Sequence, residues 1–265
     1  MSADSMTNNY AISARGIQKR FGAVVAAADI NIDVPTGQKV SLIGSNGAGK
    51  TTFVNMITGY IKPDEGQILL HGENIAGMEP RRIARMGVAR SFQIPQLFKE
   101  MTVFDNMLVA IASQAGGLSF MKPARNHAAQ ERAAELLARF ELSAHTHRTV
   151  GELPGGVRKL LDIAMALTRQ PKVLLLDEPT SGVSADEKFP MMDTVMRALA
   201  QEAVTVLFVE HDMDIVGRYA DRVIAFYSGR VIADDKPDVA LASADVQRYV
   251  TGTLTGTPTD RKEHA

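Results

Sequence analysis

Residues 40–60, VSLIGSNGAGKTTFVNMITGY, decide the fold of this chain. The apolar run VSLI at 40–43 is typical of a buried strand, and the pattern from residue 50 to residue 60 predicts a helix. Between them, GSNGAGKT at 44–51 fits the pattern G-x-x-x-x-G-K-[ST] in the strand–loop–helix context that the motif requires. Glycines let successive backbone amides converge on phosphate oxygens, and the helix N-terminus adds the positive end of its dipole. The stretch therefore predicts a phosphate-binding loop.

Two side chains at the end of this loop have defined roles in the motif. Lys50 is expected to reach the β and γ phosphates, and the Thr51 hydroxyl to ligate Mg²⁺. The alternative is a glycine-rich turn before an unrelated helix, which should match by chance in roughly one chain in a hundred when glycine makes up about 7% of residues. The predicted nucleotide-binding residues of the loop are Gly44, Ser45, Asn46, Gly47, Ala48, Gly49, Lys50, Thr51 and Thr52.

A second buried strand is predicted at 173–176, and it ends in two acidic residues, Asp177 and Glu178. A carboxylate directly after a buried strand is costly unless it meets a cation, so Asp177 is placed to hold Mg²⁺ through water. Glu178 is then the candidate general base or water-orienting group beyond the γ-phosphate. The alternative is that the two acids open a surface turn before Pro179.

A third buried strand, predicted at 204–209, is followed by Glu210, His211 and Asp212. In open α/β sheets, ligands collect at the carboxyl ends of the strands, so His211 is expected beside the same phosphate. There its imidazole would hold the attacking water or sense the γ-phosphate. A lone histidine is more often structural, and we interpret the other five as surface residues.

Strands alternate with helical patterns along most of the chain, near 158–169 and 186–200, which implies a mostly parallel sheet covered on both sides. Residues 30–34, INIDV, suit a half-exposed strand because apolar and polar side chains alternate. Between about 95 and 155, no strand pattern is evident. This region is therefore predicted to be a helical insertion.

Two helices are predicted within the insertion. Thr102 and Asp105 form a plausible capping box for a helix to about residue 113. A second helix, rich in alanine, leucine, arginine and glutamate, is expected from about 124 to 140. Residues 251–265 are polar and predict a disordered tail.

The composition is that of an ordinary globular protein, with 45% hydrophobic and 22% charged residues among 265. A net charge of −1 argues against a nucleic-acid partner, because no basic excess can neutralise phosphates. The absence of cysteine excludes disulfides and thiolate metal sites. The sequence has neither a secretory signal nor an apolar run of the roughly 18–20 residues that span a membrane. We expect a cytoplasmic protein whose membrane role, if it has one, depends on a partner.

Taken together, four segments resemble ATP-binding-cassette (ABC) ATPases in order and spacing: the loop at 44–51, the glycine pair within 153–157, the strand ending in Asp177 and Glu178, and His211. The resemblance covers roughly residues 10–240. It implies ATP and Mg²⁺ as ligands and ATP hydrolysis as the activity.

The resemblance also implies an α/β fold of the P-loop NTPase (RecA-like) class. That class has a mostly parallel core sheet, an antiparallel β region and an inserted helical subdomain, here at about 94–159. A single ABC ATPase domain is expected over 10–250, followed by the polar tail at 251–265.

Two further residues receive roles from the resemblance. Gln93 fits the glutamine at the joint between core and helical subdomain, which contacts Mg²⁺ or the attacking water and relays the nucleotide state to membrane subunits. Phe21 fits the aromatic residue that stacks on adenine, although a half-buried aromatic at a strand end is the alternative. The implied catalytic residues are Glu178, His211, Gln93 and Lys50. The implied metal-binding residues are Thr51, Gln93 and Asp177.

The family signature is usually Leu-Ser-Gly-Gly-Gln, and here it reads LPGGV at 153–157. The resemblance implies that Gly155 and Gly156 face the nucleotide held by the other subunit of a head-to-tail dimer. Pro154 removes the serine hydroxyl and its own backbone donor. A lost hydrogen bond to a charged group costs about 1.5–3 kcal/mol, so the site is predicted to be weakened rather than inactive. Ser184, where the family usually has Asp or Asn, is a second departure.

Residues 91–98, 101–110 and 210–214 are most similar to ATPase subunits of branched-chain (hydrophobic) amino acid importers. Importers of urea, aromatic acids or other organic acids look similar there. Two other hypotheses are a soluble cassette protein serving DNA repair or translation and a regulatory subunit that binds ATP without hydrolysing it.

The resemblance to importer ATPases implies several partners. These are integral membrane permeases, a second ABC ATPase in a homodimer or heterodimer, and a periplasmic or extracellular solute-binding protein. The chain would then lie on the inner face of the cell membrane, held there by the permeases.

Overall fold

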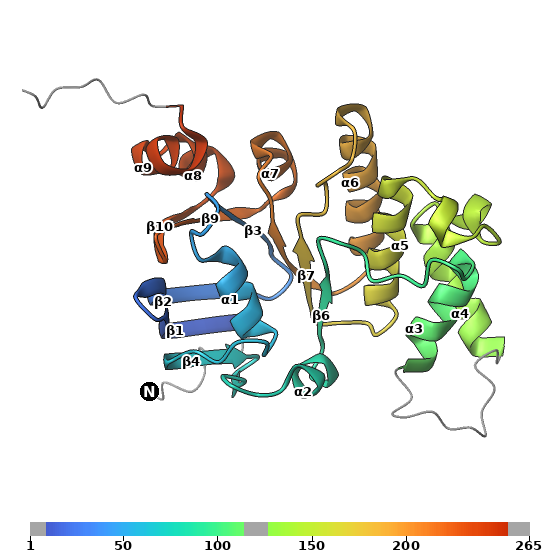
Figure 1. Ribbon diagram of the computed structural model, residues 1–265, viewed down its shortest axis with the longest axis horizontal. Helices are drawn as coiled ribbons and strands as arrows, with labels where there is room; N and C mark the ends of the chain where they lie inside the picture. The colour runs from blue at the N-terminus through green and yellow to red at the C-terminus, as the bar shows by residue number, and fades with distance from the viewer. Residues whose placement is uncertain (1–8, 114–126, 254–265) are drawn as a thin grey trace, which may run out of the picture.

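The computed structural model describes residues 9–113 and 127–253, and its strands form two sheets (Figure 1). The four-stranded sheet has the order β2-β1-β4-β5 and the six-stranded sheet the order β10-β9-β3-β8-β7-β6. The first sheet consists of β1 (Tyr10–Phe21), β2 (Val24–Pro35), β4 (Glu65–Leu70) and β5 (Glu73–Asn74). The second consists of β3 (Lys39–Gly44), β6 (Val88–Ser91), β7 (Val173–Asp177), β8 (Thr205–Val209), β9 (Arg222–Tyr227) and β10 (Arg230–Asp235).

Strand direction confirms both parts of the predicted fold class. Strands β9, β3, β8, β7 and β6 pair in parallel, and only β10 pairs antiparallel within the six-stranded sheet. All pairs of the four-stranded sheet are antiparallel. The carboxyl ends of β3, β7 and β8 therefore meet at one edge of the larger sheet, where the predicted chemistry converges.

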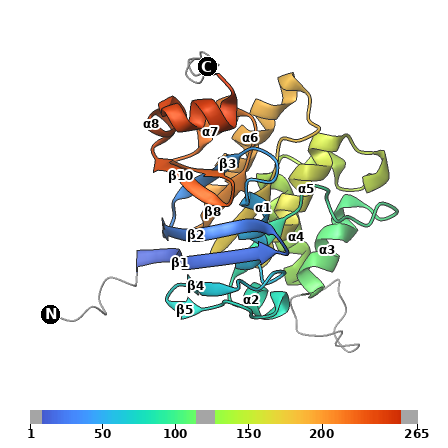
Figure 2. The same cartoon turned by 60° about the vertical axis from the view of Figure 1, so that its left-hand side comes forward.

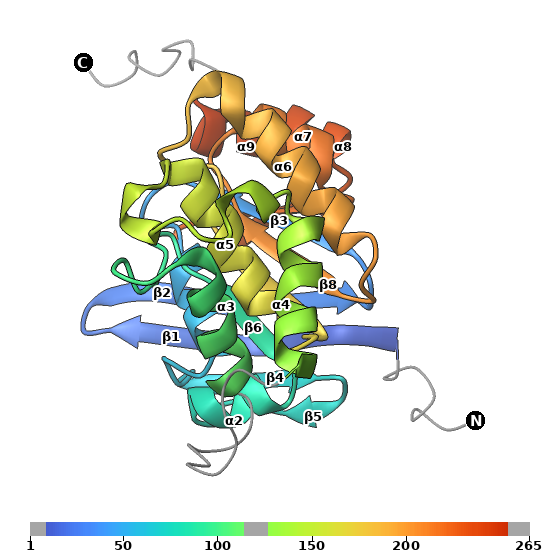
Figure 3. The ribbon, with the colours of Figure 1, turned by 90° about the vertical axis from the view of Figure 1, so that its right-hand side faces the viewer.

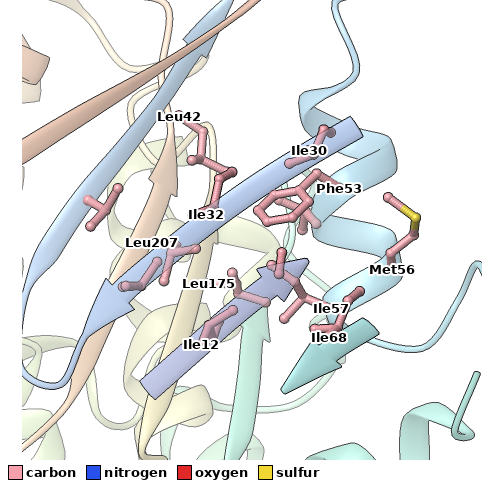
Figure 4. Close-up of a cluster of buried hydrophobic side chains, with 14 of the residues drawn as sticks. Ile12, Ile30, Ile32, Leu42, Phe53, Met56, Ile57, Ile68, Leu175 and Leu207 are labelled. Atoms are coloured by element: carbon pink, nitrogen blue, oxygen red, sulfur yellow. The ribbon is translucent and has the colours of Figure 1, made fainter. Parts of the chain in front are cut away.

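Strands β3, β7 and β8 are buried on both faces, as their apolar runs predict. Successive residues of β7 alternate between two cores: Leu175 belongs to the core between the sheets, and Leu174 and Leu176 to the core beneath the helices. Figure 4 shows the first core, in which Phe53 of α1 (Lys50–Ile57) packs among side chains of both sheets. The helix that carries the phosphate-loop lysine is thus anchored by this core.

Four longer helices cover the other face of the six-stranded sheet (Figure 3). They are α3 (Val103–Ala112), α4 (His127–Arg139), α5 (Gly155–Leu167) and α6 (Ala185–Leu199). Figures 1 and 2 place α3 and α4 on the side of the molecule opposite the four-stranded sheet. The shorter helices are α2 (Pro80–Arg85), α7 (Met213–Tyr219), α8 (Pro237–Ala242), α9 (Ala244–Val246), the 3₁₀ turns Ser143–His145 and Val150–Glu152, and a π-helical turn Gln247–Thr251.

The described part of the region from 95 to 155 contains helices and connecting turns but no strand of the two sheets. The Thr102 hydroxyl accepts a hydrogen bond from the Asp105 backbone N–H at 3.0 Å, so α3 begins at the predicted cap. The predicted start of the next helix at about 124 and the end of the predicted tail, 254–265, lie outside the described residues. The boundaries of the helical subdomain and of the ATPase domain stay predictions.

Some elements differ from the sequence prediction. The helix expected to reach residue 60 ends at Ile57, because Gly59 adopts a left-handed conformation (φ 80°) that terminates it. Strand β1 was not predicted from the sequence. Its register with β2 shifts at several points, and these shifts interrupt the alternation of inward and outward side chains. Among the helices of the described residues, none has both the length and the apolar character that crossing a membrane requires.

Candidate active site

The loop between β3 and α1 has the tight conformation that its glycines predict. Gly44 and Gly49 have φ angles of 149° and 110°. A Cβ atom on Gly44 would lie 2.4 Å from the carbonyl oxygen of Phe226, and one on Gly49 would lie 2.5 Å from that of Ala26. Both glycines are therefore required sterically, since the chain approaches β9 and β2 too closely for a side chain.

Lys50 lies inside this loop. Only 5% of Lys50 is exposed, and its ammonium group donates to the carbonyl oxygens of Gly44 at 2.6 Å and Ser45 at 3.1 Å. Burial lowers the pKa of Lys50, while the charges of Glu178 and Asp177 act in the opposite direction. The cation is thus held in place beside the cavity that the loop encloses.

The loop and the ends of β7 and β8 share one cavity of about 110 Å³. Its lining consists of Asn46, Gly47, Ala48, Gly49, Lys50, Thr51, Thr52, Glu178 and His211. The structure therefore brings two further predicted catalytic side chains, Glu178 and His211, to the loop that carries Lys50, although they are more than 120 residues away in the sequence.

Glu178 is the centre of this group. The Gln93 amide donates to Oε2 of Glu178 at 2.6 Å, and Nε2 of His211 lies 3.1 Å from Oε1. Glu178 has a left-handed backbone (φ 48°), an uncommon state for a residue with a side chain. Its N–H donates to the Val209 carbonyl at 3.0 Å, which fixes it to the end of β8. Gln93, Glu178 and His211 thus form one hydrogen-bonded set.

Glu210, which the sequence analysis did not single out, organises the turns behind His211. It is only 3% exposed, and its Oε1 accepts from the backbone N–H of Thr180 at 3.0 Å and from the Thr180 hydroxyl at 2.6 Å. Its Oε2 accepts from the His211 N–H at 3.1 Å. One carboxylate therefore joins the segments that follow β7 and β8.

Asp177, predicted to hold Mg²⁺, already has a cationic neighbour. The guanidinium of Arg90 lies 2.6 Å from Oδ2 of Asp177 and also donates to Asn55 of α1 at 2.7 Å. Arg90 is 9% and Asp177 14% exposed at the side chain, so this ion pair is largely buried. A cation beside this carboxylate is predicted from the sequence, but not that the chain supplies one itself.

The donor chemistry of the predicted metal residues fits Mg²⁺, which prefers oxygen ligands and a few carboxylates. Thr51 offers a hydroxyl in the cavity, and Asp177 offers Oδ1, since Arg90 contacts Oδ2. The amide nitrogen of Gln93 faces Glu178, so its other terminal atom is an oxygen suited to a hard cation or its water.

Phe21 lies at the end of the β1–β2 hairpin, paired with Val24 and 48% exposed. The following strand touches the phosphate loop, because Ala26 approaches Gly49 and Val25 approaches Gly229, whose N–H bonds to Ala48. The hairpin end is thus beside the loop, where the ammonium group of Lys19 lies 5.4 Å from the centre of the Phe21 ring. Its predicted contact with adenine stays a prediction.

Gly155 and Gly156 form the first residues of α5, directly after Pro154. Gly155 lines a different cavity, of about 170 Å³, which shares no lining residue with the phosphate-loop cavity. The glycine pair lies beside the loop that contains Gly182 and Val183. The chain therefore does not bring its own glycine pair to its own phosphate loop.

Helix α5 carries two buried charged side chains whose roles were not predicted from the sequence. Lys159 donates to the backbone carbonyl of Glu178 at 2.6 Å, and the Ser91 hydroxyl donates to Asp162 at 2.5 Å. Burial lowers the pKa of Lys159 and raises that of Asp162. Charged residues at the apolar positions of a helical pattern were the signal that could have found them.

Comparison with known proteins gives a consistent result. The chain is 37% identical to the high-affinity branched-chain amino acid transport ATP-binding protein LivG of Escherichia coli over 249 residues, covering 91% of this chain and 97% of that one. It is also 37% identical to BraF of Pseudomonas aeruginosa, described in the same words, over 89% of this chain and 96% of that one. The crystal structure of the ADP conformation of MJ1267, an ATP-binding cassette of an ABC transporter, matches with a TM-score of 0.81 and 33% identity over 90% of this chain and 97% of that one.

The family model described as ABC transporter matches residues 27–181, which include the phosphate loop, Gln93, the glycine pair and both acids after β7. The match spans more than half of the chain, and the ABC resemblance inferred from the sequence is confirmed. The chain belongs to the ABC transporter family, as one of its ATP-binding cassettes.

Proposed function

We propose that this chain hydrolyses ATP to power a membrane importer of branched-chain or other hydrophobic amino acids. The observation that carries the enzymatic part is the Glu178 carboxylate, held by Gln93 and His211 at the cavity that the phosphate loop lines. The choice of solute is supported by LivG and BraF, which are described as branched-chain amino acid transport proteins.

Each residue of the cavity has a role in this reaction. Lys50 and the amides of its loop bind the β and γ phosphates, with the helix dipole of α1 adding to the attraction. Glu178 accepts a proton from water while the water oxygen bonds to the γ-phosphorus. The bond between that phosphorus and the bridging oxygen then breaks, and ADP leaves with the electron pair. His211 orients Glu178, and Gln93 holds its second oxygen.

Thr51, Gln93 and Asp177 would hold Mg²⁺, which when bound neutralises charge on the phosphoryl oxygens. Arg90 lies behind Asp177 and fixes the direction of its carboxylate. Phe21, exposed at the hairpin end, would stack on the adenine ring.

A second cassette, identical or related, completes the site. Gly155 and Gly156 open α5 away from this chain's own cavity, so their amides are available to the γ-phosphate held by a partner. Two copies arranged head to tail would bury two ATP molecules between them.

Permease subunits would bind at a groove of about 590 Å³ between the core and the helical region. Tyr60 and Phe98 both lie at this groove and are 59% and 50% exposed, and apolar side chains that gather at an exposed surface mark interaction sites. Gln93 follows Phe92, which also lines the groove, so a permease bound there would be close to the catalytic set. A solute-binding protein would deliver the amino acid from the other side of the membrane.

The test is ATP-driven uptake in vesicles that contain the chain, its genetically linked permeases and their binding protein. Labelled leucine should accumulate with the wild-type chain and not with Lys50→Ala. Uptake of urea or an aromatic acid in place of leucine would keep the ATPase assignment and overturn the solute. ATP hydrolysis that Lys50→Ala leaves unchanged would overturn the assignment of the site.

A further inference from the structure

Helix α5 carries two buried charged side chains that the reaction described above does not use. Lys159 and Asp162 are each 8% exposed and lie three residues apart, on one face of the helix. Burying a charged or ionisable side chain is costly, so each must be offset by specific partners. Those partners are the backbone of Glu178 and the residues that flank Gln93.

Lys159 holds the backbone of Glu178. Its ammonium group donates to the Glu178 carbonyl oxygen at 2.6 Å. Glu178 is in a left-handed conformation that is unfavourable for a residue with a side chain, so this contact helps to maintain it. The direction in which the Glu178 carboxylate leaves the chain depends on that conformation.

Asp162 holds the segment on both sides of Gln93. Its Oδ2 accepts from the Ser91 hydroxyl at 2.5 Å, and its Oδ1 from the backbone N–H of Gln96 at 3.4 Å. Gln93 therefore lies in a short loop that is attached at both ends to one carboxyl group of α5.

The two attachments meet again at the cavity, where the Gln93 amide donates to the Glu178 carboxylate at 2.6 Å. The same helix begins with Gly155 and Gly156, about one turn before Lys159. The contacts of Lys159 and Asp162 therefore connect the helix start to Glu178 and to the segment around Gln93. Ser184 makes none of these contacts, since its hydroxyl donates to Glu187 at 2.9 Å.

We propose that Lys159 and Asp162 are positioning residues for hydrolysis, which set Glu178 and Gln93 according to the position of the helix start at Gly155 and Gly156. The proposal rests on the proposed ATPase function. Helix α5 would then connect two sites: the segment that contacts the partner's nucleotide, and the carboxylate that acts on the chain's own nucleotide.

The experiment measures kcat and KM for ATP, and the Kd of a fluorescent ATP analogue, in the purified full-length chain. Lys159→Met removes the ammonium donor, Asp162→Ala removes the acceptor, and Asp162→Asn keeps one acceptor oxygen. Arg197→Met is the matched control, because it removes a cation whose ion pair with Glu141 is exposed on the surface and does not line the phosphate-loop cavity.

Lys159→Met and Asp162→Ala should lower kcat at least tenfold while KM and Kd change less than twofold. Asp162→Asn should regain at least half of the lost rate, and Arg197→Met should match the wild type. Hydrogen exchange in residues 92–98 should rise in Asp162→Ala alone. A role in packing only would lower the melting temperature and ATP affinity without this pattern.

Wild-type kcat in both Lys159→Met and Asp162→Ala overturns the inference, and so does a parallel loss of kcat and of ATP affinity. If Asp162→Ala does not fold, Lys159→Met decides by the same criteria. Failure of the wild-type chain to hydrolyse ATP would instead overturn the proposed function, so the two failures can be told apart.

Discussion

Nε2 of His211 lies 3.1 Å from Oε1 of Glu178, so the imidazole is within hydrogen-bond distance of the carboxylate. The other oxygen accepts from Gln93 at 2.6 Å. Both carboxylate oxygens are therefore held in position by Gln93 and His211 before any substrate is bound. A base that is already oriented loses little entropy when water and triphosphate arrive.

The first prediction concerns the base. Glu178→Gln should keep ATP binding, because the phosphate loop and Lys50 are unchanged, and should lower kcat at least about 100-fold, the usual contribution of a general base. A stable ATP-bound dimer should accumulate and be visible by size-exclusion chromatography. Hydrolysis at the wild-type rate would show that Glu178 is not the base.

His211→Ala should lower kcat by less than Glu178→Gln does, since the carboxylate remains and only one of its contacts is lost. The two residues act as a unit, so the double variant should be no slower than Glu178→Gln alone. Steady-state rates of the three variants provide the measurement. Multiplicative losses would mean that the histidine works independently of Glu178.

The pH dependence of ATP binding follows from Lys50. Burial lowers the pKa of Lys50 in the free chain, and a bound triphosphate would raise it because the anion favours the charged form. Binding should therefore take up protons at alkaline pH, and affinity should fall as pH rises through the lowered pKa. Titration calorimetry in two buffers of different ionisation enthalpy measures the uptake.

Lys50→Arg is the control for this effect, because a guanidinium stays charged throughout the accessible range. The variant should bind ATP, more weakly if the longer side chain disturbs the loop, without the alkaline proton uptake. An equal uptake in this variant would assign the titration to another group.

The ion pair between Arg90 and Asp177 leads to a prediction about thermal stability and Mg²⁺ binding. Breaking a largely buried ion pair by removing one partner costs about 3 kcal/mol, so Arg90→Ala should melt several degrees below the wild type. Mg²⁺ with ATP would then supply the missing cation beside Asp177. The rise in melting temperature on adding Mg·ATP should be larger in Arg90→Ala than in the wild type.

Arg197→Met again serves as the comparison, because its ion pair is more than 60% exposed on both sides and should contribute little. If Mg·ATP stabilises Arg90→Ala no more than it stabilises the wild type, Asp177 does not face the metal.

Local chemistry explains why much of this fold and site could be predicted from sequence. Gly44 and Gly49 are required by backbone geometry, and the runs before Asp177 and His211 are buried on both faces. Each of these signals lies within a few residues of the group that it positions. The carboxyl ends of parallel strands necessarily share an edge, which brought Glu178 and His211 to the loop.

The residues that were not predicted make their contacts with residues that are far away in the sequence. Arg90 meets Asp177 across 87 positions, and Asp162 meets Ser91 across 71. Nothing near Arg90 distinguishes it from a surface arginine, and only the pairing of β6 with β7 shows its role. The irregular strand β1 and the short C-terminal helices were missed because their patterns are too brief or too broken for periodicity.

The last prediction concerns Pro154, the residue before the glycine pair. It is the N-cap of α5, with φ −56° and ψ 155°; its carbonyl accepts from the Arg158 N–H at 3.1 Å, and no side chain caps the helix. Pro154→Ser keeps this extended backbone, since serine favours the N-cap position and stabilises helices there by about 1 kcal/mol. The hydroxyl also restores a donor for a phosphate held by the partner.

Pro154→Ser should tighten ATP-driven dimerisation roughly tenfold to a hundredfold, because one hydrogen bond to a charged group is worth about 1.5–3 kcal/mol. Pro154→Ala restores only the backbone N–H and separates the two contributions. Dimer dissociation constants measured by analytical ultracentrifugation with ATP, in the Glu178→Gln background to prevent turnover, compare the three chains. If serine and alanine give equal affinities, the hydroxyl has no phosphate to meet, and α5 does not face the partner's nucleotide.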